Sequence, residues 1–293
     1  MQIFKVTISE LDAPRALRDY MRRELGFSTS LIARVKYGGI RINGEIVTMR
    51  AVLKCGDELT VEFPKESSEN IPPIDIPLDI VYEDDYLLAV NKPRNMPVHP
   101  SRGNSLPTLA NAVMAYLNRP FVFRAVNRLD RDTSGIVLIA KDPLTAALMC
   151  RAIKNGGLTK KYVGLVSGVP EIAEGEINAP IEREKDLSIK RIVRADGKPS
   201  LTRYRVVGIT QDGSSLCELE PVTGRTHQLR VHLSYIGHPL VNDFLYGEGS
   251  DNETYKLHCK SLGFLHPVNK KHIEILCKAD FENQFCPNIN SKI

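Results

Sequence analysis

The segment NRLDRDTSGIVLIAK, residues 127–141, contains the residue types best suited to chemistry. Two arginines and two aspartates precede an apolar run, Ile136–Ala140, that is typical of a buried strand. Charges beside a buried strand are costly unless they are paired, so a structural Arg–Asp network is one interpretation. The other concerns Asp130, which lies between Leu129 and the turn residues Thr133–Gly135. A carboxylate directed into a cleft could act as a nucleophile or as a general base.

A second candidate site lies in PVTGRTHQLRVHLSYIGHPLVNDFLYG, residues 221–247. A turn at Pro221–Gly224 precedes helical spacing from His227 to Tyr235. Arg225 is therefore expected at a helix N-terminus, where phosphates and carboxylates bind favourably. Together with Arg230 it could supply a pair of cationic groups for an anionic ligand.

The same segment contains groups that could bind a metal ion, namely His227, His232, His238 and Asp243. The spacing argues against a metal site, because His227 and His232 are separated by about 140° on a helix and no H-E-x-x-H motif is present. We therefore expect these histidines to have structural roles. A metal-dependent nuclease built on His227, His232 and Asp243 remains an alternative.

Two further segments combine strands with polar side chains. Lys160, Lys161 and Tyr162 are the first residues of the alternating strand KKYVGLVSG at 160–168, which places them at its N-terminal end. The segment EDDYLLAVNKPRNMPVHPS at 83–101 contains a buried strand followed by a proline-rich loop with His99. Taken alone, both segments are also consistent with ordinary structural roles.

Composition and missing motifs exclude several classes of protein. The 293 residues are 42% hydrophobic with a net charge of +4, which indicates a folded protein and permits a polyanionic partner. No apolar run is long enough for a membrane span and no signal peptide is visible, so a cytoplasmic location is expected. The six cysteines lack a C-x-x-C pair and are expected to be reduced. G-x-G-x-x-G, Walker A and G-x-S-x-G motifs are absent, which disfavours nucleotide hydrolysis, dinucleotide redox chemistry and α/β-hydrolase catalysis.

The elements that must position these residues form two units. Residues 1–64 are predicted to form a small basic domain, with two short helices and a hairpin at Asn43-Gly44. The polar, proline-rich stretch 65–77 is predicted to be a linker. Residues 78–293 mix strand-like runs with helical stretches at Thr108–Leu117 and Pro143–Asn155, which predicts an α+β catalytic domain.

Five segments in register resemble the RluA-type family of RNA pseudouridine synthases. They are ED-x-x-LLAVNKP-x-x-M-x-VHPS near 83–101, RLD-x-x-TSG at 128–135, K-x-Y-x-x-L-V-x-G at 160–168, TGRTHQLRVHL-x-x-IGHPL at 223–240 and SLGFLHP at 261–267. The basic N-terminal segment, ending in GGIRINGEIV, resembles the S4-like RNA-binding domain that often precedes this enzyme. The resemblance implies an α/β S4-like domain followed by an α+β catalytic domain with a mixed, mostly antiparallel sheet.

The resemblance also implies an activity: isomerisation of uridine within RNA to pseudouridine, without a cofactor. By the same resemblance Asp130 is the catalytic aspartate, Tyr162 stacks on the detached uracil and Arg230 pairs with the aspartate. Arg225 is the second choice for pairing with the aspartate, and otherwise a phosphate contact. The target base must leave its stack to reach such a site, and Arg128 would fill the vacated position.

The expected partner is RNA, with large-subunit ribosomal RNA the first expectation and transfer RNA the second. The RNA-binding residues are predicted to be Arg128, Asn127, Lys160, Lys161, Arg225, Arg34, Lys36 and Arg41. Asn127 occupies a position where the family usually has His, which affects the fit to the RNA. Neither a metal ion nor a membrane is expected, and the chain is expected to be a monomer. The alternative from another class is a non-catalytic RNA-binding or ribosome-assembly protein.

Overall fold

The N-terminal unit is built from short elements around one apolar cluster. The computed structural model describes residues 2–8, 14–64, 70–100, 107–118, 121–250 and 254–282. A sheet in the order β1-β6-β3-β4 backs two helices. Its elements are β1 (Gln2–Thr7), β3 (Ile40–Ile42), β4 (Glu45–Ile46), β6 (Glu58–Phe63), α1 (Leu17–Arg23) and α2 (Thr29–Val35), and the pair β2 (Arg15–Ala16) and β5 (Val52–Leu53) lies beside them. Asn43 and Gly44 both have positive φ angles, which confirms the predicted hairpin turn between β3 and β4.

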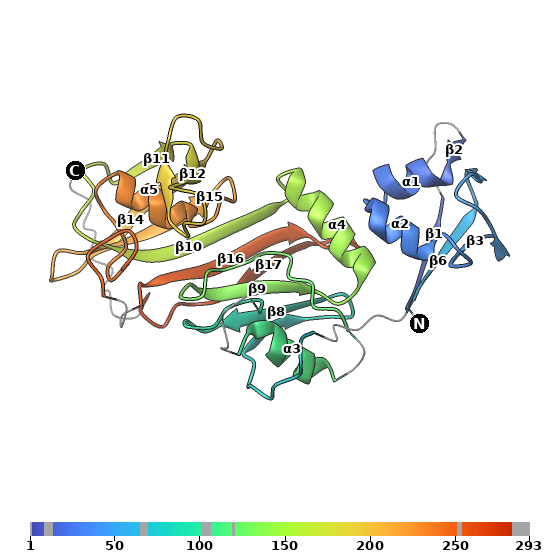
Figure 1. Cartoon of the computed structure of the whole chain (residues 1–293), viewed down its shortest axis with the longest axis horizontal. Coiled ribbons are helices and arrows are strands. Elements are labelled where there is room, and N and C mark those ends of the chain that lie inside the picture. The colour runs from blue at the N-terminus through green and yellow to red at the C-terminus, as the bar shows by residue number, and fades with distance from the viewer. Residues whose placement is uncertain are drawn as a thin grey trace.

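Within the described residues, nine strands form the large sheet of the predicted catalytic region, residues 78–293 (Figure 1). All neighbouring strands are antiparallel except β9 and β16, which run parallel. The order is β11-β14-β15-β10-β16-β9-β8-β7, with β17 also paired to β16. The strands are β7 (Ile80–Glu83), β8 (Leu87–Lys92), β9 (Ser134–Ala140), β10 (Leu158–Val166), β11 (Glu174–Asn178), β14 (Leu201–Ile209), β15 (Ser215–Pro221), β16 (Leu257–Leu265) and β17 (His272–Leu276). A mixed, mostly antiparallel sheet is thus confirmed.

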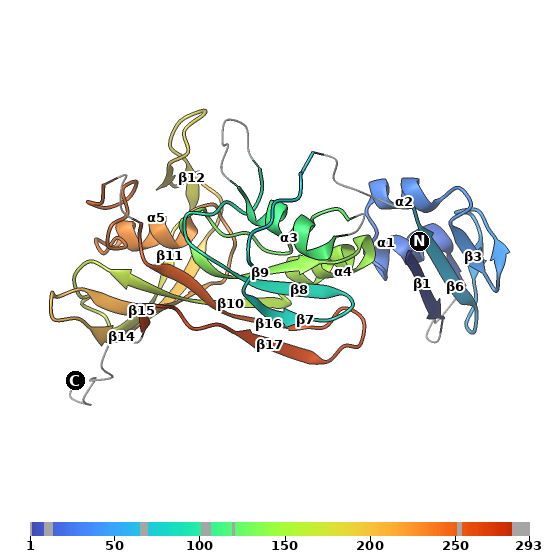
Figure 2. The same cartoon turned by 90° about the horizontal axis from the view of Figure 1, so that it is seen from below.

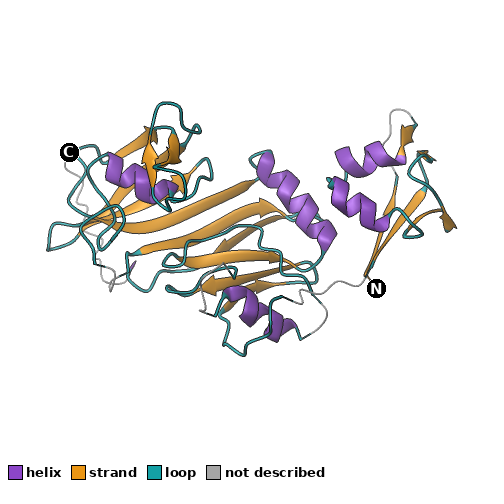
Figure 3. Ribbon diagram, viewed as in Figure 1, coloured by secondary structure: helices purple, strands orange, loops and turns teal. Residues whose placement is uncertain are grey.

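Three helices and a small hairpin cover one face of this sheet (Figures 2 and 3). The helices are α3 (Leu109–Leu117), α4 (Pro143–Lys154) and α5 (Gln228–Tyr235), and the hairpin pairs β12 (Ile181–Arg183) with β13 (Arg191–Val193). Asp142 starts α4 because its carboxylate accepts a hydrogen bond from the Thr145 backbone N–H, and Pro143 occupies the first helical position. Among the described residues, no helix has both the length and the apolar character required to cross a membrane.

The two units make direct contact through α4. Leu144 of α4 is buried within the N-terminal apolar cluster, and Ala147 and Leu148 pack against it. Of the predicted linker, residues 65–69 lie outside the described part of the chain. Residues 70–77 contain no helix or strand. Two of them are bound to Asn111 of α3: the side-chain amide of Asn111 donates to Pro72 O at 2.8 Å, and its backbone carbonyl accepts from Ile74 N–H at 3.2 Å. The domain boundaries at 64 and 77 stay predictions.

The start of β9 depends on a glycine that no other residue can replace without strain. Gly135 has a φ of +107°, and a Cβ there would lie 2.4 Å from the carbonyl oxygen of Cys259 on β16. The contact is backbone against backbone, at the parallel pairing of β9 with β16. Gly135 therefore allows the loop that carries Asp130 to enter the sheet at this point.

Gly135→Ala is expected to lower the free energy of unfolding by about 3 kcal/mol or more, because it adds the cost of an unfavourable φ to a steric clash. This corresponds to a loss of about 6–12 °C in thermal midpoint, measured by circular dichroism. Gly213→Ala is the matched control, since Gly213 also has a positive φ but nothing lies within 4 Å of its added Cβ. A midpoint for Gly135→Ala no lower than that of the control would show that β9 and β16 can move apart at little cost.

Candidate active site

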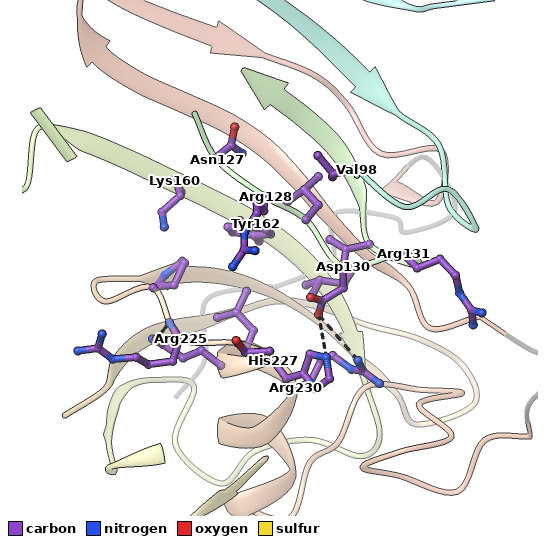
Figure 4. A pocket seen from close by; sticks show the side chains of 18 of the residues that line it. Val98, Asn127, Arg128, Asp130, Arg131, Lys160, Tyr162, Arg225, His227 and Arg230 are labelled. Atoms are coloured by element: carbon purple, nitrogen blue, oxygen red, sulfur yellow. Dashed lines mark hydrogen bonds and ion pairs between the residues drawn. The ribbon is translucent and has the colours of Figure 1, made fainter. Parts of the chain in front are cut away.

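A cavity of about 600 Å³ opens on the catalytic region where several segments meet. Its lining comes from the loop at 97–100, the loop before β9, the start of β10, the turn after β15, the first turn of α5 and Leu257 of β16 (Figure 4). Asp130, Tyr162 and Arg230 all line it, although they lie as far as 100 positions apart in the sequence. The three residues predicted to be catalytic are therefore brought together in one place.

Asp130 projects into this cavity, with 34% of its side chain exposed. Its Oδ2 lies 3.8 Å from Nη1 of Arg230 and 3.9 Å from Nε2 of His227 (Figure 4). The contact with Arg230 is an ion pair, the contact with His227 is one only when that ring is protonated, and both separations are longer than a direct hydrogen bond. The carboxylate is thus oriented by two nitrogen-bearing side chains while it stays accessible from the cavity.

Arg230 is itself held by a second carboxylate. Its Nε and Nη2 donate to Asp243 Oδ2 and Oδ1, both at 2.7 Å, in a bidentate pair whose side chains are 5% and 0% exposed. The guanidinium carbon also lies 4.4 Å from the ring centre of Tyr255 and 4.9 Å from that of Tyr246. Because Asp243 engages Nε and Nη2, Nη1 is the nitrogen directed at Asp130.

The pKa of Arg230 reflects this environment. Burial lowers the pKa, but the hydrogen bonds to Asp243 and the negative charges nearby outweigh burial, so the net pKa lies above the ordinary value. Arg230 is permanently cationic at the wall of the cavity.

Tyr162 lies on β10, where its side chain is almost fully buried but still contributes to the cavity wall. Burial raises the pKa of its phenol well above the ordinary value, and the neighbouring Cys259 and Asp130 raise it further. The phenol is therefore neutral. This side chain offers an aromatic surface to the cavity and does not act as a second anion beside Asp130.

The predicted RNA-binding residues of the catalytic region divide into two groups. Arg128 and Lys160 line the cavity, Arg128 with an exposed side chain. Arg225 also lines it, but its Nε and Nη2 donate to Pro199 O at 3.2 and 3.1 Å, so it does not take the alternative role of holding Asp130. Lys161 is exposed and lies outside the cavity lining, because neighbouring residues of a strand face opposite sides.

Asn127 lines the cavity, and its side chain is bound to the adjoining strand. Its side-chain amide donates to Ile136 O at 2.9 Å, and its side-chain oxygen accepts from Leu138 N–H at 2.8 Å. Both ends of the amide are therefore bound to the backbone of β9. Asn127 thus fixes the loop against the strand while it also lines the cavity, and its contact with RNA stays a prediction.

The remaining predicted RNA-binding residues lie in the N-terminal unit, away from this cavity. Arg34 lies at the end of α2, Lys36 stacks on the ring of Tyr37 at 4.5 Å, and Nε of Arg41 donates to Glu62 at 3.2 Å. Any contact they make with RNA is separate from the contacts around Asp130.

His227 faces Asp130, a role that the sequence analysis did not assign to it. Its Nε2 faces Asp130, and its Nδ1 lies 2.8 Å from the hydroxyl oxygen of Tyr246. That hydroxyl accepts the backbone N–H of Arg191 at 2.8 Å. Burial lowers the pKa of His227, while the charge of Asp130 opposes the shift, so the ring is neutral at pH 7. The only sequence signal was its place in TGRTHQLRVHL, where a metal or structural role was considered instead.

The alternative metal-dependent nuclease is not supported by the geometry. The two ring nitrogens of His232 are bound to Thr202 Oγ1 and Ala179 O, both at 2.9 Å. Asp243 uses both carboxylate oxygens on Arg230. Across the described residues, no set of three or more His, Cys, Asp or Glu side chains is arranged to hold a metal ion.

Lys92 is a second residue whose role was missed, and it holds two loops together. Its side chain is fully buried, and Nζ donates to Pro93 O and Met96 O at 2.8 Å and to Arg131 O at 2.9 Å. Burial lowers the pKa of Lys92 to about 7, with the charges of Asp132 and Asp130 opposing the shift. The three carbonyl acceptors match the three hydrogens of an ammonium group, and one of them belongs to the residue after Asp130.

Lys92→Met is expected to lower the free energy of unfolding by about 3 kcal/mol or more, because three buried carbonyl oxygens lose their donor. The thermal midpoint should fall by about 6–12 °C, measured by circular dichroism. Lys5→Met, at an exposed lysine of β1, is the control and should shift the midpoint by no more than about 2 °C. Equal midpoints for the two variants would mean that water replaces Lys92 without loss.

Comparison with known proteins identifies the family. Residues 86–235 match the family model described as RNA pseudouridylate synthase. A Bacillus subtilis protein named as an uncharacterized RNA pseudouridine synthase, YjbO, is 41% identical over 258 residues, which cover 85% of this chain and 90% of that protein. Ribosomal large subunit pseudouridine synthase D of Vibrio parahaemolyticus is 36% identical over 258 residues, covering 81% and 78%.

The fold leads to the same conclusion. The solved structure of human RNA Pseudouridylate Synthase Domain Containing 1 aligns with a TM-score of 0.61 at 30% identity, covering 71% of this chain and 86% of that one. The S4-like identity of the N-terminal unit stays a prediction. By its sequence and its catalytic fold, the chain belongs to the RluA-type family of RNA pseudouridine synthases, which are isomerases.

Proposed function

We propose that this enzyme converts particular uridines of large-subunit ribosomal RNA to pseudouridine, with Asp130 acting on the target nucleotide and without a cofactor. One observation carries the proposal: Asp130 is accessible in a cavity that Tyr162 and Arg230 also line, with Arg230 Nη1 at 3.8 Å. The choice of ribosomal RNA is supported by the name of the Vibrio parahaemolyticus relative. Transfer RNA is the alternative substrate class, and pseudouridine mapping distinguishes it from ribosomal RNA.

The reaction requires little beyond acid–base chemistry at one nucleotide. The N1–C1′ glycosidic bond breaks, the uracil turns, and a C5–C1′ bond forms; C5 loses a proton and N1 gains one. The composition of the nucleotide is unchanged, so no oxidant, reductant or hydrolytic water is consumed. The Asp130 carboxylate could accept a proton or attack the sugar, and both actions use the same position in the cavity.

The surrounding residues would hold the uracil while it is detached. The neutral ring of Tyr162 supplies an aromatic face for stacking, and Arg230 fixes the direction of the Asp130 carboxylate. The base must be flipped out of its stack, at a cost of a few kcal/mol. Arg128, exposed beside the cavity, is placed to enter the vacated position.

Pseudouridine mapping in cells with and without this protein tests the substrate. We expect loss of pseudouridine at a small number of positions in large-subunit ribosomal RNA and at none in transfer RNA. Loss confined to transfer RNA would overturn the substrate class, and no loss in either RNA would overturn the proposed function. Purified enzyme should modify a transcript of the same RNA after dialysis against a chelator; activity that requires an added metal or cofactor would contradict the cofactor-free chemistry.

The alternative of a non-catalytic RNA-binding or ribosome-assembly protein makes a different prediction. Such a protein does not need a carboxylate, a phenol and a guanidinium around one cavity. It would support ribosome assembly equally well with Asp130→Asn, and it would leave the mapped positions as uridine. Family membership and the geometry at Asp130 favour the enzyme.

A further inference from the structure

His227 has a backbone conformation that a histidine rarely adopts. Its φ is +57°, in the left-handed region, although it is the N-cap of α5, a position that is ordinarily extended. An N-cap side chain usually accepts a backbone N–H of the first helical turn, but the ring of His227 makes no such hydrogen bond. The ring instead forms part of the wall of the Asp130 cavity, with 14% of the side chain exposed (Figure 4). A strained backbone that places a polar ring in a cavity wall indicates a function for that ring.

One ring nitrogen of His227 is held by Tyr246. Nδ1 lies 2.8 Å from the Tyr246 hydroxyl oxygen, and that oxygen accepts the backbone N–H of Arg191 at 2.8 Å. Because the hydroxyl oxygen already accepts a hydrogen bond, its own hydrogen is available to donate to Nδ1. The neutral ring then carries its single hydrogen on Nε2, the nitrogen that faces Asp130.

The Nε2 hydrogen of His227 is available to a ligand in the cavity. Nε2 lies 3.9 Å from Asp130 Oδ2, beyond hydrogen-bond distance, and it has no hydrogen-bond acceptor among the residues that the structure describes. Electrostatics favours the same tautomer, because an N–H is attracted to a nearby carboxylate whereas a nitrogen lone pair is repelled by it. Burial lowers the pKa of the ring, as does the cation of Arg230, while Asp130 opposes both. His227 therefore presents a neutral donor to the cavity.

Isomerisation of a uridine creates an anion that such a donor can stabilise. When the N1–C1′ bond breaks, its electron pair stays with the uracil, whether Asp130 attacks the sugar or accepts a proton from it. The negative charge then spreads from N1 over the two carbonyl oxygens, O2 and O4. Nη1 of Arg230 is directed at Asp130, so the uracil needs a donor of its own. A hydrogen-bond donor fixed in place before the reaction stabilises such a charge as it develops.

We infer that His227 is a catalytic residue whose Nε2–H donates a hydrogen bond to a carbonyl oxygen of the detached uracil. The inference rests on the proposed function, because it requires the target uridine to enter the Asp130 cavity. The hydrogen stays on Nε2 throughout, since a neutral imidazole that released it would become a highly basic anion. His227 therefore transfers no proton, and the proton balance of the reaction is unchanged. A neutral ring at a helix N-terminus suits this task, because the positive end of the helix dipole disfavours protonation of the ring.

His232, on the same helix, shows how a structural histidine is arranged in this protein. It is fully buried, and its two ring nitrogens lie 2.9 Å from Thr202 Oγ1 and Ala179 O. His227 differs in both respects, because it lines the cavity and only its Nδ1 is hydrogen-bonded to the protein. A purely structural role for His227 would leave its Nε2 without a purpose.

The first test removes the donor and then restores one. His227→Phe keeps a flat ring without the Nε2–H, whereas His227→Gln keeps an N–H donor near the same position. The probe is a synthetic RNA hairpin around a uridine that pseudouridine mapping identifies, whichever RNA that uridine belongs to. We expect His227→Phe to lower the single-turnover rate about 100-fold and His227→Gln to lower it no more than about tenfold.

His238→Phe is the matched control for these variants. His238 is half-buried like His227, its Nδ1 lies 2.9 Å from Ser167 O, and it is not part of the cavity lining. The single-turnover rate of folded His238→Phe should stay within about twofold of that of the unmodified enzyme.

Sulfur substitution in the RNA tests whether Nε2–H contacts the base. Sulfur is a weaker hydrogen-bond acceptor than oxygen, so the hairpin is also made with 2-thiouridine or 4-thiouridine at the target position. At the contacted oxygen, His227→Phe and sulfur remove the same hydrogen bond, so the effect of His227→Phe should shrink from about 100-fold to less than about 20-fold. On the other sulfur-containing RNA the effect should stay near about 100-fold. A structural histidine would give the same ratio of rates on all three RNAs.

Nitrogen-15 NMR of enzyme with labelled histidine tests the tautomer, with the His227 signals assigned by their loss in His227→Phe. We expect the hydrogen on Nε2 alone at neutral pH. A hydrogen on Nδ1, or one on each nitrogen, would overturn the inference. So would equal ratios of rates on the three RNAs, or equal rates for folded His227→Phe and His227→Gln. These outcomes leave the proposed function intact as long as the unmodified enzyme converts the uridine; absence of conversion by the unmodified enzyme would refute both.

Discussion

Asp130→Asn is expected to abolish isomerisation, with a fall of at least about 10³-fold in kcat, while RNA affinity changes less than threefold. Asparagine has nearly the shape of aspartate, so the loop and its approach to Arg230 and His227 should persist. What is lost is the charge and the basicity that a proton acceptor or nucleophile requires. The measurement is single-turnover pseudouridine formation together with RNA binding on the same preparation.

Asp132→Asn is the matched control for this change. Asp132 lies in the same loop and is bound to Nε and Nη2 of Arg131 at 3.0 Å, but it is not part of the cavity lining. Asp132→Asn should lower the free energy of unfolding, but its kcat per folded molecule should stay within about tenfold of that of the unmodified enzyme. Equal activity losses for the two variants would assign Asp130 to the structural Arg–Asp network that its sequence also suggested.

Asp243→Asn is expected to produce the second large effect, on both stability and kcat. The buried guanidinium of Arg230 would lose its charge partner, which costs about 3–5 kcal/mol and lowers the thermal midpoint by about 6–20 °C. Arg230 would also lose the contact that directs Nη1 toward Asp130, so kcat should fall at least about 100-fold. Circular dichroism and single-turnover kinetics measure the two effects separately.

A double variant distinguishes positioning from simple loss of structure. If Asp243 acts on the reaction through Asp130, then Asp243→Asn should lower the midpoint in an Asp130→Asn background but reduce the residual rate no further. Asp196→Asn, at an exposed pair with Arg194, is the control and should change the midpoint by no more than about 2 °C. A full 100-fold loss in both backgrounds would contradict the positioning role.

Much of the fold could be predicted because local signals coincide with it. Asn43-Gly44 specifies its turn, Ser28 caps α2 by accepting the Leu31 N–H, and Asp142-Pro143 starts α4. The period of the apolar residues likewise predicted a helix from His227 to Tyr235, and α5 begins one residue later, at Gln228. Each of these signals acts over a few residues, which is the range that a sequence shows directly.

The site could be predicted only in part, because its contacts are long-range. Asp130 and Arg230 are 100 positions apart, and their meeting followed from the family resemblance and from no local pattern. Nothing near Lys92 indicates that its partners include Arg131 O, and nothing near Asp243 indicates its pairing with Arg230. Buried charges must find partners, but the sequence does not say which.

The hydrogen-bond partners of Asn127 could not be predicted from the sequence either. The predicted contact of Asn127 with RNA stays a prediction, but nothing in the sequence indicated that both ends of its amide are bound to β9. A side chain's hydrogen-bonding capacity can be read from sequence, but whether the backbone already uses that capacity depends on the register of a neighbouring segment.

Release of hydrogen from C5 tests the central claim most directly, since the new C5–C1′ bond must displace it. Large-subunit ribosomal RNA labelled with tritium at C5 of uridine is incubated with dialysed enzyme, and tritium in water is counted. We expect release of one equivalent per target site by the unmodified enzyme, with the RNA chain intact, and none by Asp130→Asn. Retention of the label by the unmodified enzyme, or its release by Asp130→Asn at an undiminished rate, would contradict isomerisation by Asp130.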